Sequence, residues 1–140
     1  MGKKYHICLL TSCIIPNTKT GPISEFTKEE RLTKLTKNVN YLLESFLFKE
    51  LYIIDPFINN KEKIKMFYSH LLDHGLKKSK KLKFLIFDPN KKTKLEIKNK
   101  GKGYSELEMI IEGTKKIKKE HKDILIHKIS GRYKILNINL

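Results

Sequence analysis

Two glycine-containing stretches hold the residue types best suited to binding a phosphate. Residues 101–106 (Gly-Lys-Gly-Tyr-Ser-Glu) open a predicted helix, and residues 128–133 (Lys-Ile-Ser-Gly-Arg-Tyr) end a predicted strand near the C-terminus. Arg132 is one of only two arginines among thirty basic residues. Its planar guanidinium presents several donors at once and suits a phosphate or carboxylate better than an ammonium does. We therefore expect Arg132 to bind a diphosphate, with Lys128 adding a second positive charge.

Each stretch also has a purely structural interpretation. Glycines before a helix can present backbone N–H groups to an anion, or they can simply permit a turn. Glu106, in the first turn of that helix, could hold a hydroxyl or a lysine, or could only complement the helix dipole. Gly131 could allow close approach of a ligand or a positive φ, and otherwise marks a bulged strand with Arg132 on the surface. The sequence leaves both interpretations open.

The elements that must position these residues alternate along the chain. Short apolar runs predict buried strands, at residues 5–11, 51–54, 81–87 and 124–129. A fifth short strand, or the start of a new element, is expected at residues 134–138. Strands that alternate with helices predict an α/β fold, a three-layer Rossmann-like and mostly parallel sheet flanked by helices.

Three helices are predicted between these strands. The first follows a capping box that begins at Thr27 and should extend to about Phe46, with an apolar face. The others are expected at residues 61–72 and 104–119. Residues 88–103 are lysine-rich, and we expect them to form a basic, flexible loop.

Polar residues stand where the predicted strands end. In parallel sheets ligands bind beyond the carboxyl ends of the strands, so these residues are candidates for a site. Asp55 could accept a hydrogen bond from a nucleobase or ribose, although an Asp-Pro pair also simply ends a strand. The residues at the strand ends are Thr11, Ser12, Asp55, Asp88, Ser130, Gly131 and Arg132.

Length and composition predict one globular domain over residues 1–140, because the apolar fraction is 39% and the aromatic fraction 9%. A net charge of +15 favours polyanionic partners, such as nucleotide phosphates, nucleic acid or an anionic membrane. The lysines are spread along the whole chain, so a dedicated nucleic-acid surface is the less favoured of these. No apolar run approaches the roughly 20 residues that span a bilayer, and we expect a cytoplasmic location.

Metal chemistry has little support in the sequence. His70 and His74 are four residues apart and could share a helix face, but no third ligand is evident. Cys8 and Cys13 form no metal pattern, and we expect both to be reduced thiols. We therefore predict no metal ligands.

The order of these motifs resembles a group of bacterial glycosyltransferase-like proteins from surface-polysaccharide gene clusters, those for capsule and lipopolysaccharide. The resemblance covers nearly the whole chain and depends on four stretches, residues 11–17, 30–32, 101–106 and 128–138. It implies a nucleotide-sugar transferase fold of the GT-A type. By this resemblance Thr11, Ser12, Asp55, Lys128 and Arg132 would bind the nucleotide diphosphate. The sugar cleft would contain Gly103, Tyr104, Glu106 and Gly131.

The resemblance also implies partners and a cofactor. The donor would be a nucleotide-sugar, and the acceptor a polysaccharide or a lipid-linked molecule at the inner membrane face. A divalent metal, Mg²⁺ or Mn²⁺, is expected for the family, but this chain has no Asp-x-Asp motif and lacks the usual metal- and acceptor-binding half. Catalysis is therefore left open. The alternatives are a degenerate pseudo-glycosyltransferase and a non-enzymatic basic module that binds nucleic acid or anionic lipid.

Overall fold

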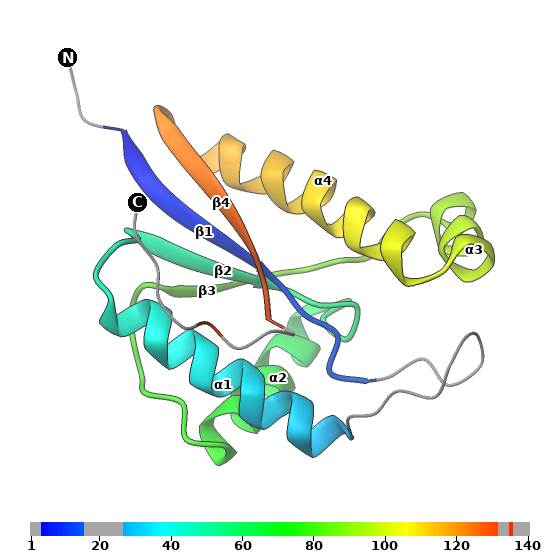
Figure 1. Ribbon diagram of the computed structural model, residues 1–140. Coiled ribbons are helices and arrows are strands. Elements are labelled where there is room, and N and C mark those ends of the chain that lie inside the picture. The colour runs from blue at the N-terminus through cyan, green and yellow to red at the C-terminus, as the bar shows by residue number, and fades with distance from the viewer. Residues whose placement is uncertain (1–3, 16–26, 132–134, 136–140) are drawn as a thin grey trace.

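The computed structural model describes residues 4–15, 27–131 and 135, and contains one four-stranded, all-parallel sheet. The strand order is β3-β2-β1-β4. The strands are β1 (Tyr5–Thr11), β2 (Glu50–Ile54), β3 (Leu82–Leu85) and β4 (Ile124–Ser130). The helices are α1 (Lys28–Glu44), α2 (Lys61–Asp73), α3 (Lys91–Lys100) and α4 (Lys102–Glu120). Figure 1 shows α1 and α2 on one face of the sheet and α4 on the other, which confirms the predicted α/β architecture.

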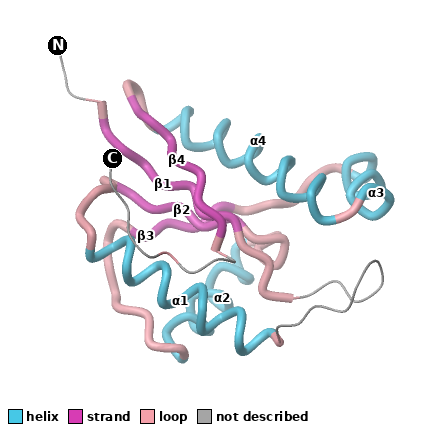
Figure 2. The backbone as a smooth tube through the Cα atoms, in the orientation of Figure 1, coloured by secondary structure: helices cyan, strands magenta, loops and turns pink. Residues whose placement is uncertain are grey.

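Strand β1 lies in the interior of the sheet and is covered on both faces. Ile7 and Leu9 pack in the core on the α4 side, whereas Cys8 and Leu10 pack in the core formed with α1 and α2. All four side chains are fully buried. A strand of a parallel sheet that is buried on both faces has a continuous apolar sequence, which is why residues 5–11 predicted it correctly. Figure 2 shows the four strands side by side between the two helical layers.

Helix α1 begins where the sequence predicted. The Thr27 side chain accepts a hydrogen bond from the backbone N–H of Glu30 at 3.2 Å. The buried face of this helix includes Leu32, Leu35, Val39 and Leu42. The helix was predicted to extend to about Phe46, but it ends at Glu44. The chain turns there, and Phe46 is 81% exposed and has a positive φ.

The prediction of a loop over residues 88–103 was wrong, because residues 91–100 form α3. Asn90 caps this helix, with its side-chain oxygen accepting from the backbone N–H of Thr93 at 2.8 Å. Lysine, leucine and glutamate are good helix formers, and together with this cap they outweigh repulsion among the lysines. Gly101, with a φ of 89°, is the single residue between α3 and α4. No helix within the described part of the chain is long and apolar enough to cross a membrane.

The chain leaves β4 in close contact with α1. Gly131 donates its N–H to the Thr11 carbonyl at 2.7 Å, and its own carbonyl accepts from the Asn38 side chain at 3.3 Å. A Cβ at Gly131 would lie 2.8 Å from a methyl group of Leu35 and 3.2 Å from the Thr11 carbonyl oxygen. The Asn38 side chain also accepts from the N–H of Ile135. The fifth strand predicted at residues 134–138 lies outside the described residues, apart from Ile135.

Replacing Gly131 by alanine should therefore destabilise the fold. The added methyl group overpacks the contact between β4 and α1, and we expect a loss of about 1–3 kcal/mol in the free energy of unfolding. Gly103→Ala is the matched control, because a Cβ there meets nothing within 4 Å and α4 is already formed at that position. The free energy of unfolding of this control should rise by about 0.4–1 kcal/mol, because alanine leaves the unfolded chain fewer conformations than glycine does. Chemical denaturation measures both, and equal stabilities of the two variants would contradict this packing.

Candidate binding site at the ends of β1 and β4

The four strands are parallel, but the order in which they are added to the sheet changes direction at β1. From β1 the chain passes through α1, β2, α2 and β3 on one side, and then returns through α4 to place β4 on the other side of β1. This reversal is a topological switch point, where open α/β sheets leave room for ligands beyond the carboxyl ends of their strands. The register pairs Thr11 with both Ile54 and Ser130, so three strands end level with one another.

Glu106 joins the ends of both strands to α4. Its Oε1 accepts from the Thr11 hydroxyl at 3.1 Å and from the Lys128 ammonium at 2.5 Å. The Lys128 and Glu106 side chains remain 34% and 41% exposed, whereas Thr11 is buried. The cluster therefore presents a positive charge and a carboxylate to solvent next to a switch point. Such a pair can attract a phosphate through the ammonium and accept a hydrogen bond from a hydroxyl through the carboxylate.

Asp55 holds the chain segment that follows β1. Its Oδ2 accepts from the Ser12 hydroxyl at 2.7 Å and from the N–H of Ile14 at 3.0 Å, and its Oδ1 accepts from the N–H of Phe57 at 2.8 Å. The residue is only 1% exposed. Asp55 thus fixes the segment after β1 from the protein interior, through hydrogen bonds from the Ser12 hydroxyl and the backbone N–H of Ile14.

The protonation of Asp55 reflects opposing influences. Burial raises the pKa of its carboxyl to about 6, because a charge loses hydration in the interior. The hydrogen bonds from Ser12, Phe57 and Ile14, and the positive charge of Arg31, act in the opposite direction. Arg31 also donates to the Cys13 carbonyl at 2.6 Å, so it fixes the same segment as Asp55 does.

Of the nine residues predicted for the site, the structure brings five to this edge, namely Thr11, Ser12, Asp55, Glu106 and Lys128. Tyr104 points elsewhere, because its hydroxyl donates to Glu96 on α3 and the Lys100 ammonium lies over its ring. Gly103 is exposed in the first turn of α4. Gly131 is buried against α1 and does not have a positive φ. Arg132 lies outside the described residues.

Sequence reasoning missed Arg31 as a residue that organises this edge. The signal that drew attention to Arg132, the rarity of arginine in this chain, applies equally to Arg31. Its partner is a backbone carbonyl eighteen residues away, which no side-chain pattern reveals. Asp55 was found, but its role as a buried acceptor depends on backbone N–H groups that only the fold brings together.

Metal coordination does not fit the described residues at this edge. Asp55 already accepts three hydrogen bonds from the protein, and Glu106 is paired with an ammonium. Across the described part of the chain, no group of three or more histidines, cysteines, aspartates or glutamates could hold a metal ion. His74, one of the two spaced histidines, instead bonds to Glu29 of α1 at 2.6 Å.

Comparison with known proteins identifies no relative of this chain. A scan of protein-family models finds none that matches, and searches of curated proteins and of solved structures find no match either. What the site binds must therefore be inferred from its own residues.

Asp55 should make a measurable contribution to the pH dependence of stability. Its folded-state pKa of about 6 exceeds the ordinary value of 3.8, so the folded protein keeps this proton to higher pH than the unfolded chain does. The free energy of unfolding should then fall as pH rises from about 4 to about 6, by about 3 kcal/mol for a shift of this size. The Asp55→Asn variant lacks this titration. Denaturation at several pH values should show the difference between the two proteins, and parallel profiles would contradict a raised pKa.

Proposed function

We propose that this chain binds a nucleotide-diphosphate sugar at the ends of β1 and β4, as the donor-binding domain of a glycosyltransferase. The observation that supports this most is the Thr11–Glu106–Lys128 cluster at the topological switch point. Sites at such points commonly bind nucleotides, because parallel strands end there and neighbouring loops diverge. The proposal of binding depends on this geometry, whereas the proposal of sugar transfer depends on the resemblance of the sequence motifs.

The proposed ligand matches the chemistry of the cluster. A nucleotide-sugar carries two phosphates and several hydroxyls, which need cations and acceptors at short range. Lys128 supplies a partly exposed ammonium, and Glu106 supplies a carboxylate that can accept from a ribose or sugar hydroxyl. Helix α4 begins near this edge, since Glu106 in its second turn contacts both strand ends, and a helix N-terminus favours an anion. Arg132, two residues beyond β4, would complete the diphosphate site.

In sugar transfer an acceptor hydroxyl oxygen bonds to the anomeric carbon, the bond from that carbon to the diphosphate breaks, and the hydroxyl proton is released to water. Negative charge then develops on the departing phosphate oxygen. Cations placed where this charge develops lower the barrier. Lys128 and Arg132 would act in this way, while Asp55 and Arg31 would keep the segment after β1 in position. The acceptor would be a polysaccharide or lipid-linked hydroxyl, which must reach the same edge.

Calorimetry with a panel of UDP-, GDP-, ADP- and dTDP-sugars tests the proposal. At least one should bind, and Lys128→Ala should weaken that binding about tenfold to a hundredfold, the range for hydrogen bonds to charged groups. Lys83→Ala is the matched control, because Lys83 is an exposed strand lysine of β3 whose charge acts on Glu50 at the opposite end of β2. Its binding should equal that of the wild type.

Arg132 can be tested in the same titrations. Arg132→Ala should weaken binding by about 1.5–3 kcal/mol, and Arg132→Lys should recover only part of this, because an ammonium cannot form the bidentate contact of a guanidinium. Failure of every nucleotide-sugar to bind the wild type would overturn the proposal. Binding that neither Lys128→Ala nor Arg132→Ala weakens would place the ligand elsewhere.

A further inference from the structure

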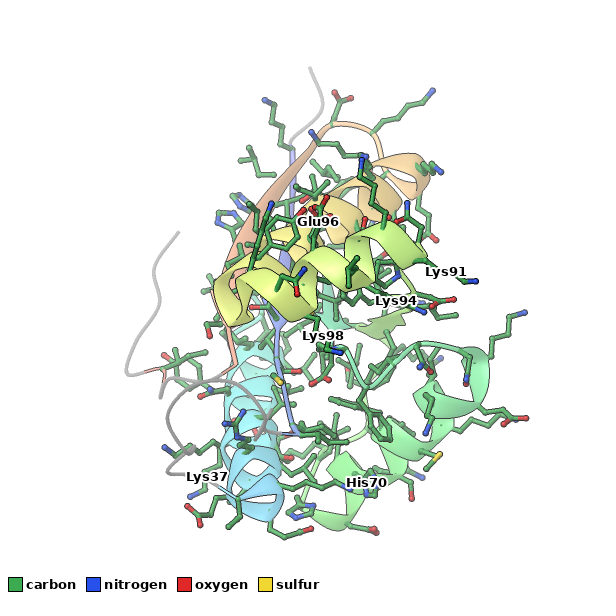
Figure 3. The ribbon with its side chains drawn as sticks, turned by 90° about the vertical axis from the view of Figure 1, so that its right-hand side faces the viewer. Lys37, His70, Lys91, Lys94, Glu96 and Lys98 are labelled. Carbon is green, nitrogen blue, oxygen red and sulfur yellow. The ribbon has the colours of Figure 1, made fainter. Side chains whose placement is uncertain are left out.

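Helix α3 is a strongly basic helix with almost no role in the core. It contains five lysines and one glutamate, and none of its residues is buried. Its contacts with α4 involve Glu96 and Lys100, which meet Tyr104, while Ile97 packs at the margin of the core. Leu95 is 59% exposed. Figure 3 shows Lys91, Lys94 and Lys98 along α3, which lies at the front of this view.

The side of α4 that faces away from the sheet also carries exposed apolar and basic side chains. Met109, Gly113 and Ile117 face the sheet and are buried. Leu107 and Ile111, four residues apart, lie on the other side and are 51% and 40% exposed. The exposed Lys115 and Lys118 extend the same side toward the end of the helix. We call the exposed side chains of Lys91, Lys92, Leu95 and Lys98 on α3, with Leu107 and Ile111 on α4, the α3–α4 surface.

We infer that the α3–α4 surface docks on an anionic membrane. Within a helix, residues three or four apart are neighbours, so Leu95 lies beside Lys91, Lys92 and Lys98. Among the described residues, no carboxylate forms a salt bridge with any of these three lysines, whereas Lys94 pairs with Asp88. Lys92 also lies one turn from Glu96, and its positive charge acts on that carboxylate. Exposed aliphatic side chains beside lysines that form no salt bridge match a membrane interface, where the chains enter the acyl boundary and the ammonium groups meet anionic headgroups.

The same surface is less suited to nucleic acid. Single strands are held by aromatic stacking together with cations, and base edges are read largely by arginine and amide side chains. The α3–α4 surface offers leucine and isoleucine, and the neighbouring Tyr104 ring is engaged by Lys100 and its hydroxyl by Glu96. Aliphatic side chains gain nothing on a phosphate backbone, whereas each one buried in a bilayer interface leaves water.

The inference does not depend on the proposed nucleotide site, but the two are compatible in space. Leu107 directly follows Glu106 on α4, and α3 precedes the same end of that helix. Docking through this surface would hold the carboxyl ends of β1 and β4 near the plane of the membrane. A lipid-linked acceptor would then be within reach of that edge.

Vesicle sedimentation of the full chain tests the inference. The probes are vesicles of equal parts phosphatidylglycerol and phosphatidylcholine, and vesicles of phosphatidylcholine alone. The wild type should bind the anionic vesicles, with weaker binding at high salt, and should not bind the neutral ones. The triple variant Lys91→Glu, Lys92→Glu, Lys98→Glu should lose binding by at least ~100-fold, since each lysine near an anionic leaflet contributes a factor of about five.

Two further variants separate this surface from general charge. The first is a control triple variant, which makes the same charge change at exposed lysines of α1 and α2 in the other layer, namely Lys37→Glu, Lys61→Glu and Lys65→Glu (Figure 3 labels Lys37). It should bind the anionic vesicles at least tenfold more tightly than the α3 variant does. Leu95→Gln with Leu107→Gln keeps every charge and should weaken vesicle binding roughly tenfold or more, because burial of apolar area is lost. Circular dichroism confirms that each variant is folded.

Three outcomes would overturn the inference. The first is that the wild type does not bind anionic vesicles. The second is that both triple variants lose binding equally, which indicates diffuse charge. The third combines two results. The leucine variant binds vesicles as tightly as the wild type does, and a duplex or single-stranded oligonucleotide is bound by the wild type but not by the α3 variant, which indicates a nucleic-acid surface.

Discussion

The burial of β1 on both faces is the constraint on which the rest of this structure depends. Its side chains from Ile7 to Leu10 are enclosed between two helical layers, so none of them can meet a ligand. At the carboxyl end of this strand, polar chemistry begins at Thr11 and the residues that follow. The reversal of strand order places the end of β4 beside it. The fold thus allows one edge of the sheet to become a binding site and fills the interior with apolar contacts.

At that edge two carboxylates have different environments and therefore different roles. Asp55 is buried and surrounded by N–H and O–H donors, so it acts on the protein by holding the segment after β1. Glu106 is partly exposed and paired with Lys128, so it can exchange a protein partner for a ligand hydroxyl. The first keeps the backbone of the edge in place and the second presents charge to solvent. A ligand site needs both, because a charged group binds selectively only when its support is rigid.

The sequence predicted what depends on local pattern. The strands follow from apolar runs, and the start of α1 follows from the Thr27 cap, because both patterns are set by near neighbours. Helix α3 was missed because its lysines suggested a loop, although Asn90 and the helix-forming composition pointed to a helix. The rule on strand ends predicted Thr11 at the site, whereas Glu106 and Lys128 were predicted from the two glycine-containing stretches, with Glu106 as a possible partner of a lysine. The roles of Arg31 and Gly131 could not be predicted, because they depend on a carbonyl and on methyl groups from distant segments.

The most direct test of the central claim is to map the binding edge by nuclear magnetic resonance. Isotope-labelled protein is titrated with the nucleotide-sugar that binds most tightly, or with UDP and GDP, while backbone amide shifts are followed. The account predicts that the largest shifts fall on Thr11–Ile14 and on the last residues of β4, with Glu106 in α4. Shifts confined to α2, or to the opposite ends of the strands near Glu50 and His121, would contradict it.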